Sequence, residues 1–212
     1  MEPGFGGLLA TTLIARLRQS GIDPARAYVG GGAALHAYLA SIGAHPAWTP
    51  TDVDVFIEPG ARPVVDDMNA LHAALSGHDN RVSTCRIFAA IPGFPCVDFL
   101  FSGKQRTVLE WAGSFDLSAC QVYLNLAAWA DGKFMFVGAS EADIRRGVMR
   151  VPPTLYRRLM TGDPDGDMTA HAFKKERRAR KYMERGFAIA PDEAFEHVMS
   201  YNDSAEWNSE PE

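Results

Sequence analysis

The sequence has 212 residues, of which 47% are hydrophobic and 22% charged, and its formal net charge is −5. These are ordinary values for a globular protein with a sizeable core. No apolar run approaches the roughly 18–20 residues that cross a bilayer, and the first residues lack a secretory signal, so we expect no membrane partner. Cys85, Cys96 and Cys120 are widely spaced, which argues against a zinc site or a disulfide framework and favours the cytoplasm.

Apolar periodicity and glycine and proline positions predict a mixed α/β fold (α/β or α+β), with a mixed central sheet flanked by helices. In chain order we expect a helix at 8–19, a strand at 25–29, a helix at 33–42, a strand at 53–57, a helix at 63–76, strands at 83–90 and 96–101, a short strand or linker at 106–111, strands at 115–124 and 133–137, and helices at 140–147, 154–160, 169–185 and 191–199.

This order predicts three parts. Residues 1–150 would form a mixed α/β core, and residues 151–200 a short helical C-terminal region packed on it. Residues 201–212 would be a disordered acidic tail, because they carry acids and no Lys or Arg.

Three glycines and two aspartates stand out in the core. Gly30, Gly31 and Gly32 follow a short strand and open an apolar helix, and glycine lets the backbone approach a phosphate closely. Asp52 and Asp54 share one strand face, roughly 6.6 Å apart. A buried strand does not normally carry two acids on one face, since burying charge without partners is costly. Carboxylates beside a phosphate-sized gap indicate a magnesium site.

Two further acids lie in apolar surroundings. Asp98 is embedded in the segment Cys96–Phe101, where it could simply pair with an arginine. Three carboxylates on adjacent strands, however, are what two magnesium ions about 3.5–4 Å apart require. Asp116 could add a fourth acid to the site, although an acid at a strand start more often caps or pairs structurally.

In the segments Val29-Gly-Gly-Gly-Ala33 and Asp52-Val-Asp54 and in Asp98, the sequence resembles the DNA polymerase β-like nucleotidyltransferase superfamily. The resemblance implies a core that transfers a nucleoside monophosphate from a nucleoside triphosphate (NTP) to a hydroxyl. It implies that Asp52 and Asp54 hold two Mg²⁺ ions, with Mn²⁺ as an alternative. Asp98 would bind the metal nearest the attacking hydroxyl.

The resemblance also implies a nucleotide site. Backbone N–H groups at Gly31, Gly32 and Ala33 would hold the triphosphate of ATP or another NTP. The stretches 115–121 and 178–187 look like a less-studied branch of the superfamily that phages and large viruses often carry, which would place the protein in a host cytoplasm.

A dinucleotide-binding turn is the competing interpretation of the glycines. Gly30-x-Gly32 follows a strand, and an acid lies about twenty residues further on, as that fingerprint requires. Leu35 occupies the place of the third glycine, and Asp98 has no role in such a site.

A basic helix precedes the acidic end of the chain. Lys174, Arg178, Lys181 and Arg185 recur at three- and four-residue spacing and therefore share one helix face. One interpretation is a solvated face balanced by the acidic tail. The other is that Arg178 and Lys181 bind the triphosphate or the phosphates of the acceptor as a cationic clamp.

The leading hypothesis is a magnesium-dependent nucleotidyltransferase that releases pyrophosphate. We favour an RNA or tRNA 3′ end as acceptor over a protein side chain or a small molecule. One alternative is a catalytically idle protein of this fold that serves as a binding or regulatory module. Another is a metal-dependent nuclease, which would use similar carboxylates without needing the glycine turn.

Overall fold

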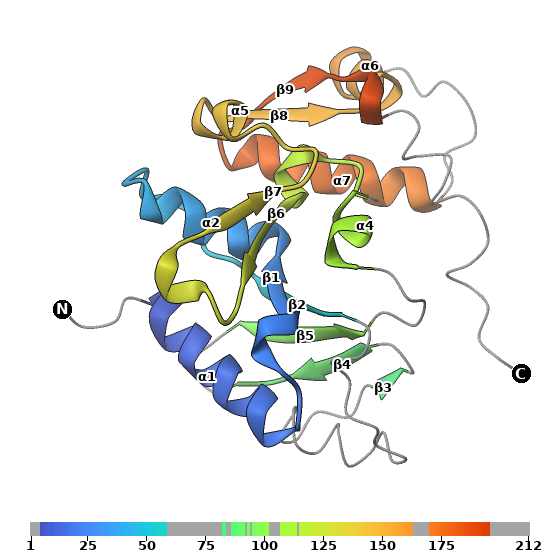
Figure 1. Ribbon diagram of the computed structural model, residues 1–212. Coiled ribbons are helices and arrows are strands. Elements are labelled where there is room, and N and C mark those ends of the chain that lie inside the picture. The colour runs from blue at the N-terminus through green and yellow to red at the C-terminus, as the bar shows by residue number, and fades with distance from the viewer. Residues whose placement is uncertain are drawn as a thin grey trace, which may run out of the picture. The chain divides into compact units, whose positions relative to one another are not determined.

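The computed structural model describes residues 5–58, 82–83, 86–91, 93, 95–101, 107–113, 115–162 and 170–195 (Figure 1). The chain forms two compact units, of residues 1–111 with 122–137 and of residues 112–121 with 138–212. These units differ from the functional division expected at residue 150, which stays a prediction. The helix expected at 63–76 and the acidic tail at 201–212 lie outside the described residues. No helix within the described ranges is both long and apolar enough to cross a membrane.

The first unit is built on a mixed sheet of seven strands in the order β3-β4-β5-β2-β1-β6-β7 (Figure 1). The strands are β1 (Ala27–Gly30), β2 (Asp52–Ile57), β3 (Val82–Ser83), β4 (Arg86–Ala89), β5 (Cys96–Phe101), β6 (Val122–Asn125) and β7 (Phe134–Phe136). The pair β2 and β5 is parallel, and the other neighbouring pairs are antiparallel. The expected mixed α/β fold with a mixed central sheet is thereby confirmed.

Helices of the first unit follow from apolar spacing and capping. They are α1 (Phe5–Gln19), α2 (Gly31–Ser41) and α4 (Val108–Ala112), with the 3₁₀ turns η1 (Pro24–Arg26) and η3 (Trp129–Asp131). On α1, Leu9, Leu13 and Leu17 recur every four residues and form a buried stripe. Helix α2 packs on β6, β2 and β1, where Val53 and Val55 are fully buried.

The expectation of a short strand or linker at residues 106–111 is wrong, because α4 occupies this segment. Thr107 Oγ1 accepts a hydrogen bond from the backbone N–H of Glu110, at 3.3 Å, and Glu110 Oε2 accepts one from the N–H of Thr107, at 2.7 Å. This reciprocal pair is a capping box, and it starts a helix. The Thr-x-x-Glu spacing was present in the sequence as a signal for it.

The second unit combines helices with a small sheet. Its elements are η2 (Ser118–Cys120), α5 (Glu141–Arg145), β8 (Val148–Val151), α6 (Pro153–Thr161), α7 (Ala170–Glu184), β9 (Ala188–Pro191) and η4 (Glu193–Phe195). Strands β8 and β9 pair directly in parallel, and α6 and α7 connect them in the sequence. The C-terminal region expected to be helical therefore also contains a strand. The strand expected at 115–124 is η2 followed by β6.

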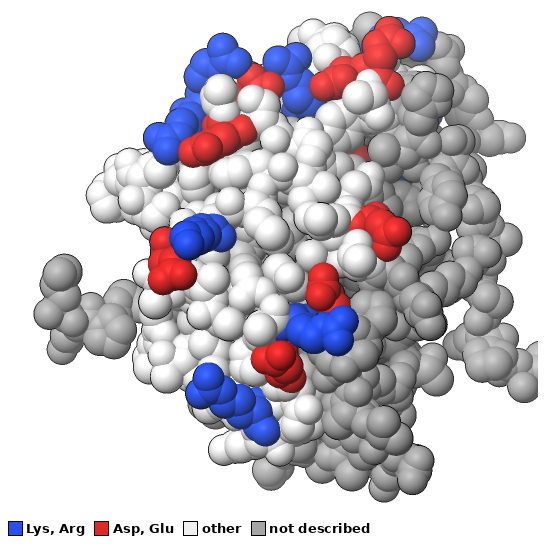
Figure 2. All heavy atoms as spheres, in the orientation of Figure 1, with Lys and Arg blue, Asp and Glu red and all other residues white. Residues whose placement is uncertain are grey.

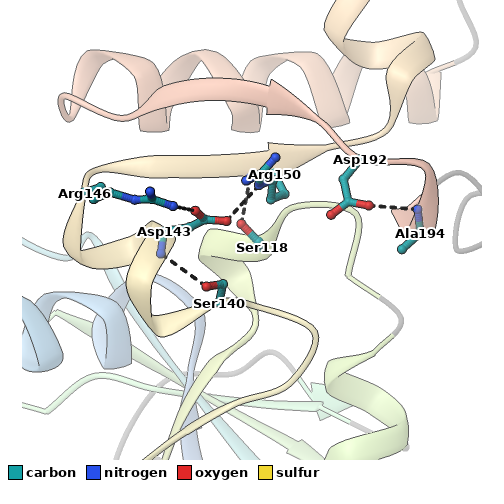
Figure 3. A network of polar contacts seen from close by, with 7 residues as sticks. All are labelled: Ser118, Ser140, Asp143, Arg146, Arg150, Asp192 and Ala194. Atoms are coloured by element: carbon teal, nitrogen blue, oxygen red, sulfur yellow. Dashed lines mark hydrogen bonds and ion pairs between the residues drawn. The ribbon is translucent and has the colours of Figure 1, made fainter.

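A polar network fastens residues 115–121 to β8 in this unit (Figure 3). The carboxylate of Asp143 accepts hydrogen bonds from Arg150 Nε, at 2.8 Å, and from Arg146. These two bonds hold the pKa of Asp143 below its ordinary value. The hydroxyl of Ser118 accepts a hydrogen bond from the backbone N–H of Arg150 at 2.8 Å. Ser140, the N-cap of α5, accepts one from the N–H of Asp143.

Candidate functional site

Three aspartates lie on one face of two neighbouring strands. Asp54 of β2 and Asp98 of β5 are register partners in the parallel pair. Partners in parallel strands point to the same face, and the strands lie about 4.8 Å apart. Asp52 precedes Asp54 by two residues and shares that face. Asp98 is only 3% exposed, Asp54 is half-buried and Asp52 is exposed, so the row of acids runs from the interior to solvent.

These carboxylates suit magnesium, whose preferred ligands are oxygen atoms. Asp54 and Asp98 are already neighbours. The carboxylate of Asp52 instead accepts a hydrogen bond from the hydroxyl of Thr51 at 3.0 Å. As the side chains lie, no three His, Cys, Asp or Glu residues within the described part of the chain are grouped so that they could hold a metal ion. Asp54 and Asp98 are therefore the acids that the structure brings together, and carboxylate oxygens of this kind are ligands that Mg²⁺ accepts.

The glycines before and at the start of α2 serve different structural needs. Gly30 is the register partner of Asp54, and a Cβ at Gly30 would stand 2.4 Å from a ring carbon of Tyr123 and 2.6 Å from one of Phe56. Gly31 has a φ of +60°, a left-handed conformation that favours glycine. Its missing Cβ would stand 3.6 Å from Asp54 Oδ2. Gly32 lies in the first turn of the helix.

The N-terminus of α2 is suited to an anion. Its N-cap is Gly30, which makes no side-chain capping bond, and the first turn carries no acid. The first backbone N–H groups of a helix lack partners within the helix, so they bind phosphate readily. The carboxylate of Asp54 beside Gly31 would repel such an anion unless a cation stood between them. The site therefore combines N–H groups that can donate hydrogen bonds to an anion with carboxylates that can bind a cation. A metal-bound triphosphate requires both.

The side chain of Ala33 lies on the side of the sheet opposite to the aspartates. It borders a cavity of about 360 Å³ together with Val53 and Leu124. Because strand side chains alternate, the face of Val53 is opposite to that of Asp52 and Asp54. Only the backbone N–H of Ala33 is left to serve a phosphate at the helix start.

The two cations expected at the nucleotide belong to the second unit. Arg178 Nη1 forms an ion pair with Asp116 Oδ1 at 3.1 Å, and the Asp116 side chain is 3% exposed against 42% for Arg178. Desolvation lowers the pKa of the Arg178 guanidinium, but its interactions with Cys120, Asp116 and Tyr182 outweigh this effect, and the net direction is upward. Asp116 thus has the pairing role that is more common for such an acid. The triphosphate roles of Arg178 and Lys181 stay predictions.

Tyr123 is a site residue that sequence reasoning did not connect to the glycines. It lies on β6, next to β1, and is fully buried behind Gly30, with its ring edge-on to that of Phe56. The sequence held no signal for this contact, because the pairing of β1 with β6 joins segments more than ninety residues apart.

The antiparallel pairing of β1 with β2 excludes the dinucleotide-binding interpretation. In that motif the strands on either side of the glycine-opened helix are parallel neighbours in a βαβ unit. Here the helix joins two antiparallel strands.

Comparisons with known proteins bear on the fold. No family model and no curated protein matches the sequence. The chain is similar to the solved structure of an apo CCA-adding enzyme, with a TM-score of 0.51 and 16% identity over 84% of this chain and 43% of that one. For a CCA-adding enzyme in complex with ATP the values are 0.51, 14%, 92% and 46%. For the Thermotoga maritima CCA-adding enzyme complexed with tRNA they are 0.51, 15%, 89% and 45%.

The chain therefore spans less than half the length of these enzymes. At identities of 14–16% the likeness concerns the fold alone. The chain shares its mixed α/β fold with part of each of these CCA-adding enzymes.

Proposed function

We propose that the protein is a magnesium-dependent nucleotidyltransferase that moves a nucleoside monophosphate from an NTP to the 3′ hydroxyl of an RNA. The observation that carries this proposal is the register of Asp54 with Asp98 beside the glycine-opened start of α2. The fold shared with enzymes solved with ATP and with tRNA supports it. Membership of a phage-borne branch stays a prediction.

Different groups of the chain would bind the metal ions and the triphosphate. Asp52, Asp54 and Asp98 would hold two Mg²⁺ ions, which Mn²⁺ could replace. Backbone N–H groups at Gly31, Gly32 and Ala33, in the first turn of α2, would bind the triphosphate. When bound, the ions stabilise charge on the attacking and leaving oxygens.

The reaction balances without a further reactant. The acceptor oxygen forms a bond to the α-phosphorus, the bond from that phosphorus to the bridging oxygen breaks, and pyrophosphate leaves. We place Asp98 nearest the acceptor hydroxyl, where a carboxylate accepts the proton and helps to generate the nucleophile. A tRNA 3′ end is the favoured acceptor, and a protein or small-molecule hydroxyl is the other possibility.

The test offers each labelled NTP, with Mg²⁺ or Mn²⁺, to total RNA, purified tRNA and total protein. We expect pyrophosphate release with label on RNA. Asp54→Asn and Asp98→Asn should each lower the rate on the order of 10²–10³-fold, the scale for losing one group that stabilises charge in the transition state. Asp131→Asn is the matched control, because it removes the same charge from an exposed site of the first unit.

Other results would overturn the proposal in distinct ways. RNA shortening without use of NTP would make the protein a nuclease. Binding of NTP without transfer to any acceptor would make it an idle binding module. Equal rates for Asp54→Asn and Asp131→Asn would remove the acids from the mechanism.

A further inference from the structure

Helix α7 has a buried face and a basic outer face. Lys175, Ala179 and Tyr182 recur at four- and three-residue spacing and are buried. At 100° per residue, Lys174, Arg177, Lys181 and Arg185 fall within an arc of about 80° elsewhere on the helix. We call these four residues the basic stripe. Lys174 and Arg177 are exposed, and Lys181 and Arg185 are half-exposed.

Lys174 and Arg177, two members of the basic stripe, differ from two arginines of α7 that lie outside it. Arg178 is paired with Asp116, and Arg180 is paired with Glu176 at 2.7 Å. Lys174 and Arg177 make no ion pair with any residue that the structure describes. Their charge is therefore available to a partner.

The stripe also differs from the face of the molecule that is drawn in Figure 2. On the face in Figure 2, blue and red side chains mostly stand next to each other rather than in fields of one sign. Ion pairs such as Arg145–Glu141 and Lys133–Asp131 are examples of this balance. The four cations of the stripe have one acid at their edge, the exposed Glu184, and this excess of positive charge favours a polyanionic partner.

An aromatic residue stands beside the stripe. Phe173 is 53% exposed, which is unusual for a large apolar side chain. On the helix it lies about 40° from Arg177. Proteins that bind single-stranded nucleic acid combine cations along the backbone with aromatic rings on which bases stack. Phe173 supplies the second half of that combination.

The length of the stripe matches a short stretch of strand. From Lys174 to Arg185 the helix rises about 16 Å, at 1.5 Å per residue. A stacked strand carries one phosphate per roughly 3.4 Å, so about four or five phosphates lie along this distance. Arg177 can also hold a phosphate through two parallel hydrogen bonds.

We propose that the basic stripe and Phe173 bind a single-stranded segment of the RNA acceptor, with phosphates on Lys174 and Arg177 and a base stacked on Phe173. The choice of RNA rests on the proposed function. Binding itself can be measured without catalysis, so the two proposals can fail separately.

The experiment measures fluorescence anisotropy of a labelled 12-nucleotide RNA, without NTP or metal, over a series of salt concentrations. The variant Lys174→Gln/Arg177→Gln should lower the slope of log affinity against log salt by about 1.4, since each lost phosphate contact on a single strand contributes about 0.7. The control Arg18→Gln/Lys133→Gln removes the same charge from exposed positions of the first unit and should leave the slope unchanged.

A second variant tests the stacking. Phe173→Leu should weaken binding by about 5- to 150-fold, the range for losing one base–aromatic stack, and Phe173→Tyr should retain it. Equal loss in Phe173→Tyr and Phe173→Leu would overturn the stacking role. Circular dichroism of each variant confirms that α7 still folds.

Three results would overturn the proposal as a whole. The first is an equal loss in the two double variants, which would make binding a net-charge effect. The second is an unchanged slope in Lys174→Gln/Arg177→Gln. The third is competition by a polyglutamate peptide as strong as that by RNA, which would make the partner an acidic protein.

The same samples separate this proposal from the proposed function. Asp131→Asn, which changes an exposed acid of the first unit outside the proposed metal site, should bind RNA like the unmodified protein. If the stripe binds RNA and no transfer is found with any NTP, the proposed function is wrong and the RNA-binding role of the stripe is retained. If transfer proceeds with the same KM for RNA in both double variants, the RNA-binding role of the stripe is wrong and the proposed function is retained.

Discussion

Replacing Gly30 by alanine should destabilise the first unit through a steric clash alone. The backbone there is extended, with φ of −127° and ψ of 178°, so alanine incurs no conformational penalty. The new Cβ, however, would stand 2.4 Å and 2.8 Å from two ring carbons of Tyr123 and 2.6 Å from one of Phe56. Carbon atoms pack at about 3.5–4.0 Å, so the rings must move by about 1 Å.

The surroundings leave little room for that movement. Tyr123 is fully buried, and its ring packs edge-on against Phe56 with centroids 5.3 Å apart. Overpacking a well-filled core costs about 1–3 kcal/mol, and a clash with two rigid rings belongs in the upper half of this range. At an m-value of about 2.5 kcal/mol/M, a loss of about 2 kcal/mol lowers the urea midpoint by roughly 0.8 M.

Urea unfolding followed by tryptophan fluorescence measures this effect, because Trp48 and Trp129 belong to the first unit. Gly43→Ala is the matched control, since Gly43 has no atom within 4 Å of a new Cβ and its φ of +77° adds strain without a clash. The double variant Gly30→Ala/Tyr123→Leu should lose less stability than the sum of its single variants. An unchanged midpoint in Gly30→Ala, or strict additivity in the double variant, would refute the packing argument.

Two further predictions concern the second unit. Replacing Arg178 by glutamine should destabilise the second unit, because the buried carboxylate of Asp116 loses its ion-pair partner. We expect a cost of about 3 kcal/mol, the low end for a broken buried ion pair, because Arg178 is 42% exposed. Asp116→Asn should cost less, because water can reach the guanidinium, and a larger loss for Asp116→Asn than for Arg178→Gln in thermal unfolding would contradict this order. The depressed pKa of Asp143 makes its ionised form stabilising above the ordinary value of 3.8, and that contribution is lost as pH falls through the folded-state pKa. Asp143→Asn should therefore lower the urea midpoint by a constant amount at pH values above 3.8, and the difference from the unmodified protein should shrink as the pH falls below 3.8. A difference that stays constant below 3.8 would contradict the Arg150–Asp143 charge pair as the cause.

The sequence by itself determined the local features of the candidate site. The spacing of Asp52 and Asp54 placed them on one strand face, and the glycine run marked the start of a helix within two residues of Gly31. Both inferences depend only on the two-residue repeat of a strand and on the backbone freedom of glycine. The three- and four-residue spacing also indicated a basic face on α7, but it placed Arg178 on that face, and the structure pairs Arg178 with Asp116 and leaves Arg177 to the basic stripe.

Only the tertiary structure decided which of these features meet. The parallel register of β2 with β5 places Asp54 beside Asp98, and the antiparallel pairing of β1 with β2 rules out a dinucleotide site. Tyr123 lies behind Gly30 because β6 pairs with β1. The ion pair of Arg178 with Asp116 joins residues 62 positions apart.

Each of these contacts depends on strand register and core packing. Register is set when a whole apolar face is buried at once, so it depends on many distant residues together and not on the few around a motif.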